Sequence, residues 1–138
     1  MSMRARLRSR AKAMTDKLER RKAAEIRGRR SETLAALFLV CKFYRVIGRR
    51  VKTRVGELDL VALSPSGVLC FIEVKARGLE NDAVAAVTLR QRARITRAAA
   101  LYLAARPGLR HKAVRFDAML VTPRRLPTHI RDAWRPEF

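Results

Sequence analysis

The chain has 138 residues, and 49% of them are hydrophobic, which is enough for one domain with its own core. Its 32 lysines and arginines outnumber 12 acidic residues and give a formal net charge of +20, which favours a polyanionic partner, nucleic acid before an anionic membrane. No apolar run approaches the length of about 18 residues that a spanning helix needs, and no signal-peptide core follows the basic start, so we expect a cytoplasmic protein without a membrane partner.

The first 41 residues predict a basic arm followed by a helix. We expect the arm over residues 1–24, partly helical or mobile, and a single domain over residues 25–138. Residues 1–30 hold twelve basic and three acidic side chains and lack a sustained apolar stripe, so they cannot form a core. Residues 31–41 predict a core-facing helix, because four residues repeat at helical spacing: Leu34, Leu37, Phe38 and Cys41.

Three strands are expected next. Residues 44–55 are β-rich and basic, with a bulge or break predicted at Gly48. Residues 58–63 and 68–76 predict a hairpin, because Pro65 suits the first position of a three-residue loop and Gly67 suits a left-handed third position. A loop centred on Ser66 sets a register in which opposed residue numbers sum to 132.

The C-terminal part predicts a helix, a strand and a short final element. The helix is expected between residues 81 and 106, with an inward stripe that includes the polar residue Gln91. Residues 113–121 predict a strand, and the segment "THIRDAW" predicts a short turn or helix. Cys41 and Cys70 lie singly in apolar runs, without the spacing of a zinc site or the density of a disulfide scaffold, and are expected to be buried reduced thiols.

The hairpin register gathers charged residues. It places Asp59 opposite Glu73 and, two residues along, Glu57 opposite Lys75. Side chains alternate along a strand, so all four fall on one face. Opposed carboxylates repel, and burying either one unpaired costs several kcal/mol, so a cation is expected between them. Asp59 and Glu73, together with Glu32 of the first helix, offer the oxygen ligands that Mg²⁺ or Mn²⁺ prefers. Lys75 can then orient the nucleophile or stabilise charge on a phosphodiester.

These residues resemble a known nuclease signature. Asp59, a turn and then Glu73-Val74-Lys75 resemble the PD-(D/E)xK pattern of restriction-endonuclease-like folds. More closely, the stretches "GRRSETLA", "GELDLVA", "FIEVKAR", "RFD" and "HIRDAW" resemble the YraN family of small bacterial proteins that are predicted endonucleases, over roughly residues 25–135. The resemblance implies an α/β fold with an αβββαβ core, a central mixed sheet flanked by helices, related to archaeal Holliday-junction resolvases.

The resemblance also assigns roles to residues. Glu32 matches the acid on the first helix, and Asp59 and Glu73 match the metal ligands. Lys75 matches the catalytic lysine, and Gln91 matches a helix glutamine found in part of the superfamily. The chain departs from the pattern twice: Arg90 stands where many relatives carry lysine, and Leu58 stands where the signature's name has proline. The second departure is common in this fold and weakens only the name.

We therefore expect a Mg²⁺-dependent endonuclease acting on DNA, including branched or damaged DNA, with Glu57 at the rim of the site in support of Lys75. Phosphate contacts are expected from seven basic side chains: Arg49, Arg50, Lys52, Arg54, Arg77, Arg90 and Arg94. The sequence leaves two alternatives open, a non-catalytic nucleic-acid-binding module and a scaffold in a DNA repair or uptake assembly. A homodimer is also left open.

Several candidate residues have structural explanations as well. Gln91 is as well suited to a structural hydrogen bond as to the site. Asp117 is expected to pair with a neighbouring arginine, and His111 and His129, which lack partners at ligand spacing, are expected at the surface. Three aromatic residues lie in apolar contexts and are expected in the core: Phe116, Tyr102 and Trp134.

Overall fold

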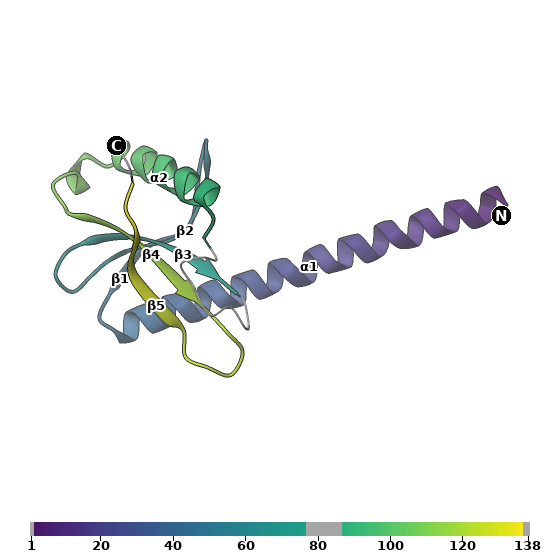
Figure 1. Cartoon of the computed structure of the whole chain (residues 1–138), viewed down its shortest axis with the longest axis horizontal. Coiled ribbons are helices and arrows are strands. Elements are labelled where there is room, and N and C mark those ends of the chain that lie inside the picture. Colours follow the sequence, from purple (N-terminus) through teal and green to yellow (C-terminus); the bar gives the residue numbers. More distant parts are fainter. Residues whose placement is uncertain (1, 77–86, 137–138) are drawn as a thin grey trace. The chain divides into compact units, whose positions relative to one another are not determined.

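A computed structural model describes residues 2–76 and 87–136 of the chain. The chain divides into two compact units, Met1–Arg30 and Ser31–Phe138. Helix α1 (Met3–Cys41) occupies the described part of the first unit and extends into the second. The second unit also contains a five-stranded sheet and a further helix (Figure 1). Its remaining elements, in chain order, are β1 (Arg45–Thr53), β2 (Gly56–Leu63), β3 (Leu69–Lys75), α2 (Leu89–Ala104), the 3₁₀ turn η1 (Pro107–Leu109), β4 (Val114–Leu120) and β5 (Thr128–Trp134).

The sheet has the strand order β1-β2-β3-β4-β5. β1, β2 and β3 are antiparallel neighbours, β3 and β4 run parallel with α2 in the connection between them, and β5 returns antiparallel to β4. The predicted α/β class with a central mixed sheet is therefore confirmed. None of the helices in the described ranges is long and apolar enough to cross a membrane.

The β2–β3 hairpin has the predicted register. The described ladder runs from the pair Leu63–Leu69 to the pair Leu60–Ile72, and each pair sums to 132. Ser64 and Val68 close the loop, and Gly67 has a left-handed φ of 87°, a conformation that glycine adopts at little cost. The predicted bulge in β1 is also present, as a register shift between Val46 and Gly48. Local turn chemistry thus fixes which residues of the two strands face each other.

Two apolar clusters cover opposite faces of the sheet. Successive residues of β3 belong to different clusters, Phe71 to one and Ile72 to the other, as the strand period of two requires. The Phe71 cluster includes four residues of α2: Ile95, Ala98, Ala99 and Tyr102. The Ile72 cluster includes three residues from the last turns of α1: Ala35, Ala36 and Leu39. As predicted, Phe116, Tyr102, Trp134 and Cys70 are buried.

The predicted inward face of α1 is wrong. Leu34 and Leu37 are more than half exposed and Cys41 is exposed, whereas Ala35, Ala36 and Leu39 point inward; of the predicted stripe, Phe38 is half-buried and packs against the core. Both sets repeat at helical spacing, so periodicity alone cannot choose between them. The two inward alanines allow the helix backbone to approach the sheet closely, and the bulky residues remain outside.

The end of α1 is closed by a residue that rarely fills this role. The Tyr44 amide donates to the Leu39 carbonyl and the Phe43 amide to the Val40 carbonyl, the two bonds of a Schellman motif, with a left-handed residue at Phe43 (φ 66°). Glycine is usual there, because a side chain costs energy in this conformation. Phe43 is nevertheless 84% exposed, so its ring contributes little to the core.

The segment "THIRDAW" is strand β5, and the prediction of a short turn or helix is wrong. It pairs with β4 through Phe116–Trp134 and Ala118–Ile130, with a register shift between these pairs. Long-range pairing with β4 stabilises the extended form, which local sequence does not report. The predicted helix before residue 87 lies outside the described residues, and α2 begins at Leu89 behind its N-cap, Thr88.

A buried polar cluster joins β4 and β5. Asp117 is fully buried and accepts hydrogen bonds from Arg115, from the His129 ring and from the Asp132 amide. The predicted pairing of Asp117 with an arginine is thus confirmed, as is the exposure of His111. The prediction of a surface His129 is wrong: its side chain is 2% exposed, because Asp117 on the next strand holds it inside.

Candidate active site

The candidate site lies where the β2–β3 ladder ends. Beyond the last described pair, Leu60–Ile72, the Val74 amide donates to the Asp59 carboxylate, with 2.9 Å between nitrogen and Oδ2. A side chain of β2 thus binds the backbone of β3 where a strand-to-strand bond would otherwise be expected. This contact holds the Asp59 carboxylate against β3, the strand that carries Glu73.

Asp59 and Glu73 interact directly. Burial of the Asp59 carboxyl raises its pKa, and the charge of Glu73 and a hydrogen bond between the two carboxyls raise it further, to about 7. The Val74 amide and the ammonium of Lys75 act in the opposite direction but do not offset burial and repulsion. Near neutral pH the two carboxyls therefore share a proton for part of the time. A metal cation could replace this proton between them.

Lys75 lies beside this pair. Its Nζ is 3.4 Å from Glu73 Oε1, and the two side chains are 17% and 11% exposed. The two residues are two apart on β3, so both project to the same side of the strand. The site thus joins two carboxylates and one ammonium on adjacent strands, still within reach of solvent.

Glu32, the third predicted acid, is engaged elsewhere. It is buried on α1 and forms an ion pair with Arg50 of β1. Among the described residues, no three histidine, cysteine, aspartate or glutamate side chains are grouped as they would be around a metal ion. Asp59 and Glu73 are brought together, whereas a three-carboxylate site would need Glu32 to leave Arg50.

The two remaining carboxylates nevertheless suit one kind of ion. Mg²⁺ is commonly held by one or two carboxylates plus the phosphates of its substrate, with water at the other positions. Asp59 and Glu73 share a hydrogen bond and repel each other when both are charged, which is the condition that a hard divalent cation relieves. The donor set fits Mg²⁺ or Mn²⁺, with Asp59 and Glu73 as the holding residues.

Two supporting residues have simpler roles in this structure. Gln91 forms a capping box with Thr88: the Gln91 amide donates to the Thr88 hydroxyl, and the Gln91 side-chain oxygen accepts from the Thr88 amide. Its capping function accounts for a polar residue at the start of α2. Glu57 is exposed at the start of β2 and is opposite Lys52 on β1. Its predicted pairing with Lys75 lies beyond the described β2–β3 ladder.

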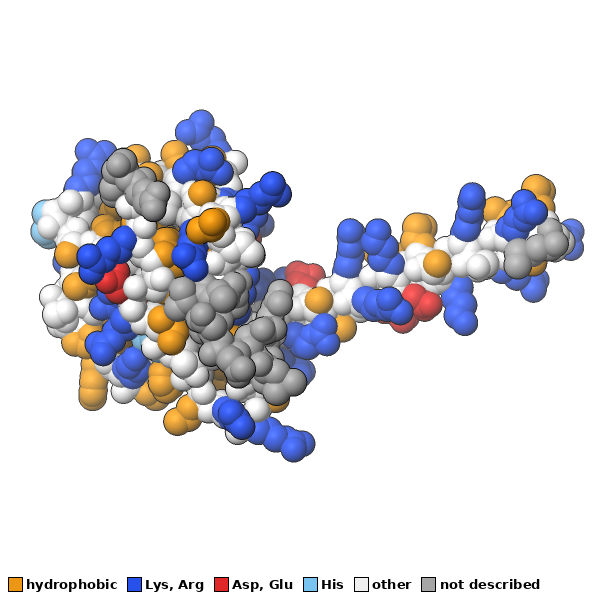
Figure 2. Space-filling view, in the orientation of Figure 1, with side chains coloured by type: hydrophobic (Ala, Val, Ile, Leu, Met, Phe, Trp, Pro, Cys, Tyr) orange, Lys and Arg blue, Asp and Glu red, His pale blue; other side chains and the backbone are white. Residues whose placement is uncertain are grey.

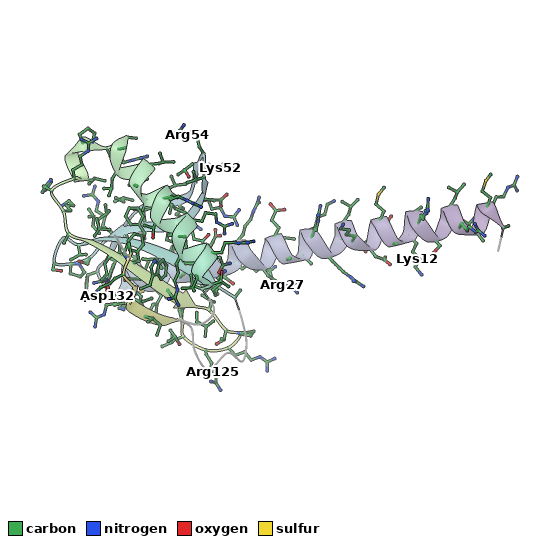
Figure 3. The ribbon with its side chains drawn as sticks, turned by 45° about the horizontal axis from the view of Figure 1, so that its top comes forward. Lys12, Arg27, Lys52, Arg54, Arg125 and Asp132 are labelled. Carbon is green, nitrogen blue, oxygen red and sulfur yellow. The ribbon has the colours of Figure 1, made fainter. Side chains whose placement is uncertain are left out.

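The predicted phosphate-binding residues surround the β1–β2 hairpin. Lys52 and Arg54 are exposed at its tip (Figure 3). Arg94 of α2 lies against the same hairpin, because a Cβ atom added to Gly56 would come within 2.9 Å of its side chain. Arg49 donates to the Thr33 hydroxyl of α1.

Figure 2 shows many lysine and arginine side chains and few acidic ones on the visible face of each unit. Arg90 is exposed in the first turn of α2, and Arg77 lies outside the described residues. Of the described residues predicted to contact phosphate, four therefore lie on β1 or at the β1–β2 turn (Arg49, Arg50, Lys52 and Arg54) and two lie on α2 (Arg90 and Arg94); Arg50 is bound to Glu32.

Three cavities lined by described residues lie away from the candidate site. A cavity of about 620 Å³ lies between α2 and the strands β4 and β5, lined by Phe116 and Trp134 among others. Neither the lining of this cavity nor that of two smaller ones includes Asp59, Glu73 or Lys75.

Two features of the site had no signal in the sequence. The bond between the Val74 amide and Asp59 joins residues 15 apart, and the pair of Glu32 and Arg50 joins residues 18 apart. Arg50 also has a left-handed φ of 50° within a strand, which local propensity disfavours for any residue but glycine, asparagine or aspartate.

Comparisons with known proteins agree on one family. Residues 31–121 match the model of "Uncharacterised protein family UPF0102". A UPF0102 protein of Maricaulis maris is 48% identical over 116 residues, which cover 84% of this chain and 91% of that protein. One of Caulobacter sp. is 45% identical over 125 residues, with 91% and 89% covered, and one of Parvibaculum lavamentivorans is 49% identical over 109 residues, with 79% and 81% covered.

Proposed function

This chain belongs to UPF0102, the family of the YraN proteins, and from that premise we propose that it is a Mg²⁺-dependent nuclease that hydrolyses phosphodiester bonds in DNA. The observation that carries the proposal is the meeting of Asp59 and Glu73 beside Lys75 at the end of the β2–β3 ladder. Folding alone does not favour two interacting, largely desolvated carboxyls, so their position has a use outside the fold.

Each residue of the set has a role in this proposal. Asp59 and Glu73 would hold the ion, and a Mg²⁺ ion there would supply Lewis-acid stabilisation for attack on phosphorus. Lys75, held by Glu73, donates hydrogen bonds to a phosphate oxygen and stabilises the negative charge that grows during displacement. The amide of Val74 orients Asp59, and exposed Lys52 and Arg54 bind the DNA backbone beside the site.

Cleavage assays test the proposal. The substrates are linear duplex, single-stranded and branched DNA, each incubated with Mg²⁺, Mn²⁺ or EDTA. We expect metal-dependent cleavage of at least one substrate and its loss in Glu73→Gln, which keeps the size of the side chain but removes the charge that holds the ion. Absence of cleavage on every substrate, together with unchanged DNA binding in Glu73→Gln, would contradict the nuclease proposal.

A second candidate function is supported by a specific observation. Because Glu32 is engaged with Arg50, Glu32, Asp59 and Glu73 do not form one three-carboxylate group, as is also expected of a non-catalytic DNA-binding module. The two functions respond differently to the loss of the Asp59 charge. In an enzyme, Asp59→Asn should abolish cleavage. In a binding module, it should only remove the repulsion between this carboxylate and a nearby phosphate.

Both candidates require DNA binding, which salt dependence can test. The net charge of +20 and the exposed arginines predict counterion release, so affinity for duplex DNA should fall about 10³-fold between 50 and 200 mM salt if about six phosphates are contacted. Deleting residues 1–20, which hold seven basic and two acidic side chains, should lower this salt slope and leave any cleavage position unchanged. Binding that is independent of salt would indicate another kind of partner.

A further inference from the structure

Trp134 carries a buried polar group without a partner. The residue lies at the end of β5 and is 7% exposed, and its Nε1 is a buried donor that has no acceptor among the described residues. Buried polar groups are almost always hydrogen-bonded, because an unsatisfied donor loses its bond to water and gains none in return. An acceptor supplied by another molecule would therefore be bound favourably at this position.

The same indole forms part of the walls of two adjoining cavities, of about 620 and 500 Å³. Four residues line both cavities: Thr96, Trp134, Arg135 and Pro136. Volumes of roughly 300–1,000 Å³ are usual for small-molecule sites. Asp59, Glu73 and Lys75 line neither cavity, so this is a second location, apart from the candidate active site.

The walls of the larger cavity suit an apolar body. Val68, Leu103, Val114 and Phe116 contribute to its lining, and Val114 is 41% exposed although its side chain is apolar. Phe116 also stacks on Trp134, with ring centroids 5.5 Å apart and an angle of 27° between the planes. One face of the indole is therefore in use, and the N–H edge is the part that a ligand would contact.

Thr96 adds an acceptor to the same lining. Its hydroxyl donates to the Arg92 carbonyl, with 2.8 Å between the oxygens, so the lone pairs of the hydroxyl oxygen remain able to accept. A ligand that matches both groups has an acceptor for Trp134 and a donor for Thr96. A hydrocarbon chain has neither and a carboxylate has acceptors alone, whereas the edge of a nucleobase has both on an apolar ring.

The charge around the cavities favours an anion. The described charged residues that line them are four arginines and one aspartate: Arg92, Arg97, Arg115, Arg135 and Asp132. Asp132 is bound to Arg135, and Arg115 to Asp117, while Arg97 is exposed on α2. The excess of guanidinium groups suits the phosphate of a nucleotide.

We propose that these cavities bind a nucleobase: Trp134 Nε1 donates to a ring nitrogen or carbonyl of the base, Thr96 accepts from it, and the arginines at the rim face its phosphate. The proposal goes beyond the proposed function, because it needs neither a metal ion nor the pair of Asp59 and Glu73. The base has two possible sources, a free nucleotide or an unpaired base of a DNA strand, because a base stacked and paired inside a duplex cannot enter a pocket.

Equilibrium dialysis of the full chain in EDTA tests the site. The probes are the deoxynucleoside monophosphates of A, C, G and T and, as a ligand without a base, deoxyribose 5-phosphate. We expect saturable binding of at least one nucleotide, and binding of deoxyribose 5-phosphate that is weaker by about 10-fold or more. The nucleotide should also change the fluorescence of Trp134, the only tryptophan of the chain, which reports binding beside the indole.

Two alanines of α2 provide a matched pair of variants. Ala100 is exposed and lines the larger cavity, so Ala100→Leu fills part of it without changing the core and should weaken nucleotide binding about 10-fold. Ala104 is also exposed but lines none of the three cavities, so Ala104→Leu should keep the wild-type affinity. Trp134→Phe removes the N–H but keeps a ring on Phe116, and should weaken binding about 5-fold, the net value of one hydrogen bond.

Duplex DNA with a single unpaired 2-aminopurine, a fluorescent base, separates the two sources. If the base comes from a strand, this duplex should bind more tightly than a fully paired one. The 2-aminopurine fluorescence should then change on binding to the wild type and to Ala104→Leu, but not on binding to Ala100→Leu. If nucleotides bind and the unpaired base has no effect, the site serves free nucleotides. Either result supports a nucleobase site.

Three results would overturn the proposal. The first is the absence of both nucleotide binding and a preference for the unpaired base. The second is equal binding by Ala100→Leu and Ala104→Leu. The third is binding of decanoate, an apolar anion without a donor, when no nucleotide binds. None of them affects the proposed function, which is tested by metal-dependent cleavage and by Glu73→Gln, a residue that lines neither cavity.

Discussion

Two aspartates of the same sheet have opposite electrostatic environments. Asp117 is fully buried and accepts hydrogen bonds from Arg115, from His129 and from the Asp132 amide. Asp59 has one backbone donor and faces another carboxylate. A buried acid that is fully paired stabilises the fold, whereas one placed against a like charge is poised to bind something else.

The pKa values of the two groups show the same contrast. Burial raises the pKa of Asp117, but the hydrogen bonds from His129, Arg115 and the Asp132 amide outweigh it, so the pKa is lowered from its usual value. Burial also raises the pKa of Asp59, and Glu73 adds to it, giving about 7. Burial acts in the same direction in both cases, and the neighbours decide the outcome.

The largest expected effect is the loss of Asp117. Asp117→Ala leaves Arg115 inside the protein without its carboxylate and removes an acceptor from His129, so it should lower the free energy of unfolding by about 3–5 kcal/mol. Urea denaturation at pH 7 measures this loss. Asp132→Ala, which leaves the backbone amide that binds Asp117 in place, should cost much less, and similar losses for the two variants would contradict the central role of Asp117.

The next effect concerns chemistry rather than stability. Lys75→Ala removes the ammonium beside Glu73 and should lower kcat/KM for DNA cleavage by roughly 2–4 kcal/mol in transition-state stabilisation. Its free energy of unfolding should fall by less than that of Asp117→Ala, because the Asp59–Glu73 pair can take up a proton when the ammonium is removed. Parallel cleavage and denaturation measurements separate the two quantities. A loss of stability as large as that of Asp117→Ala would remove the distinction between the two sites.

The third substitution, at Asp59, should raise the free energy of unfolding instead of lowering it. Because the folded pKa of Asp59 is about 7, above the usual value of 3.8, the folded chain retains a proton that the unfolded chain releases, and this group's contribution to stability is lost as pH rises from 4 through 7. Asp59→Asn imitates the protonated form and can donate to Glu73. Without metal, it should raise the free energy of unfolding at pH 8 by about 1–2 kcal/mol, and it should make little difference near pH 4.

Asp117 should respond to pH in the reverse direction. Its pKa is lowered in the folded chain, so its contribution to stability is present above the usual value of 3.8 and disappears as pH falls through the folded pKa.

Thermal denaturation tests the Asp59 prediction. Measured for the wild type and for Asp59→Asn from pH 4 to pH 8, it records the Asp59 contribution as the difference between two curves. Parallel curves across this range would show that Asp59 is not protonated in the folded protein.

The smallest effect tests the edge of the paired cluster. Lys42 Nζ lies 2.8 Å from His129 Nδ1, while His129 Nε2 lies 2.8 Å from Asp117, so a neutral ring donates to Asp117 and accepts from Lys42. Lys42→Met should lower the free energy of unfolding by about 1 kcal/mol, the net value of one hydrogen bond. The substitution Lys52→Met, at an exposed position of β1 on the opposite edge of the sheet from β5, is the control in the same denaturation assay.

The sequence predicted the hairpin more accurately than the helix that packs on it. The turn at Pro65 and Gly67 determines the register locally, so the meeting of Asp59 and Glu73 followed from counting. The inward face of α1 depends on how closely a helix can approach the sheet, and the choice between Leu37 and Ala36 is made by the partner surface.

The remaining errors share a physical origin. His129 is buried because of Asp117, and β5 is a strand because β4 offers it an edge; both contacts cross between strands. Arg50 has a positive φ, a backbone conformation that arginine rarely adopts and that its sequence context does not predict. Local patterns predict elements and turns, whereas pairs of polar side chains distant in sequence require the tertiary arrangement that brings them together.

The continuity of α1 has a consequence for how its basic part becomes ordered. Starting a helix is the costly step, because several residues must be fixed before the first hydrogen bond is gained, whereas each later residue adds one bond. Ala35 and Leu39 are held against the sheet, so the packed turns act as a permanent nucleus from which the helix grows backwards to Met3. Amide hydrogen exchange should therefore become steadily faster towards the N-terminus. A step is expected at Gly28, because glycine is about 1 kcal/mol less favourable than alanine inside a helix.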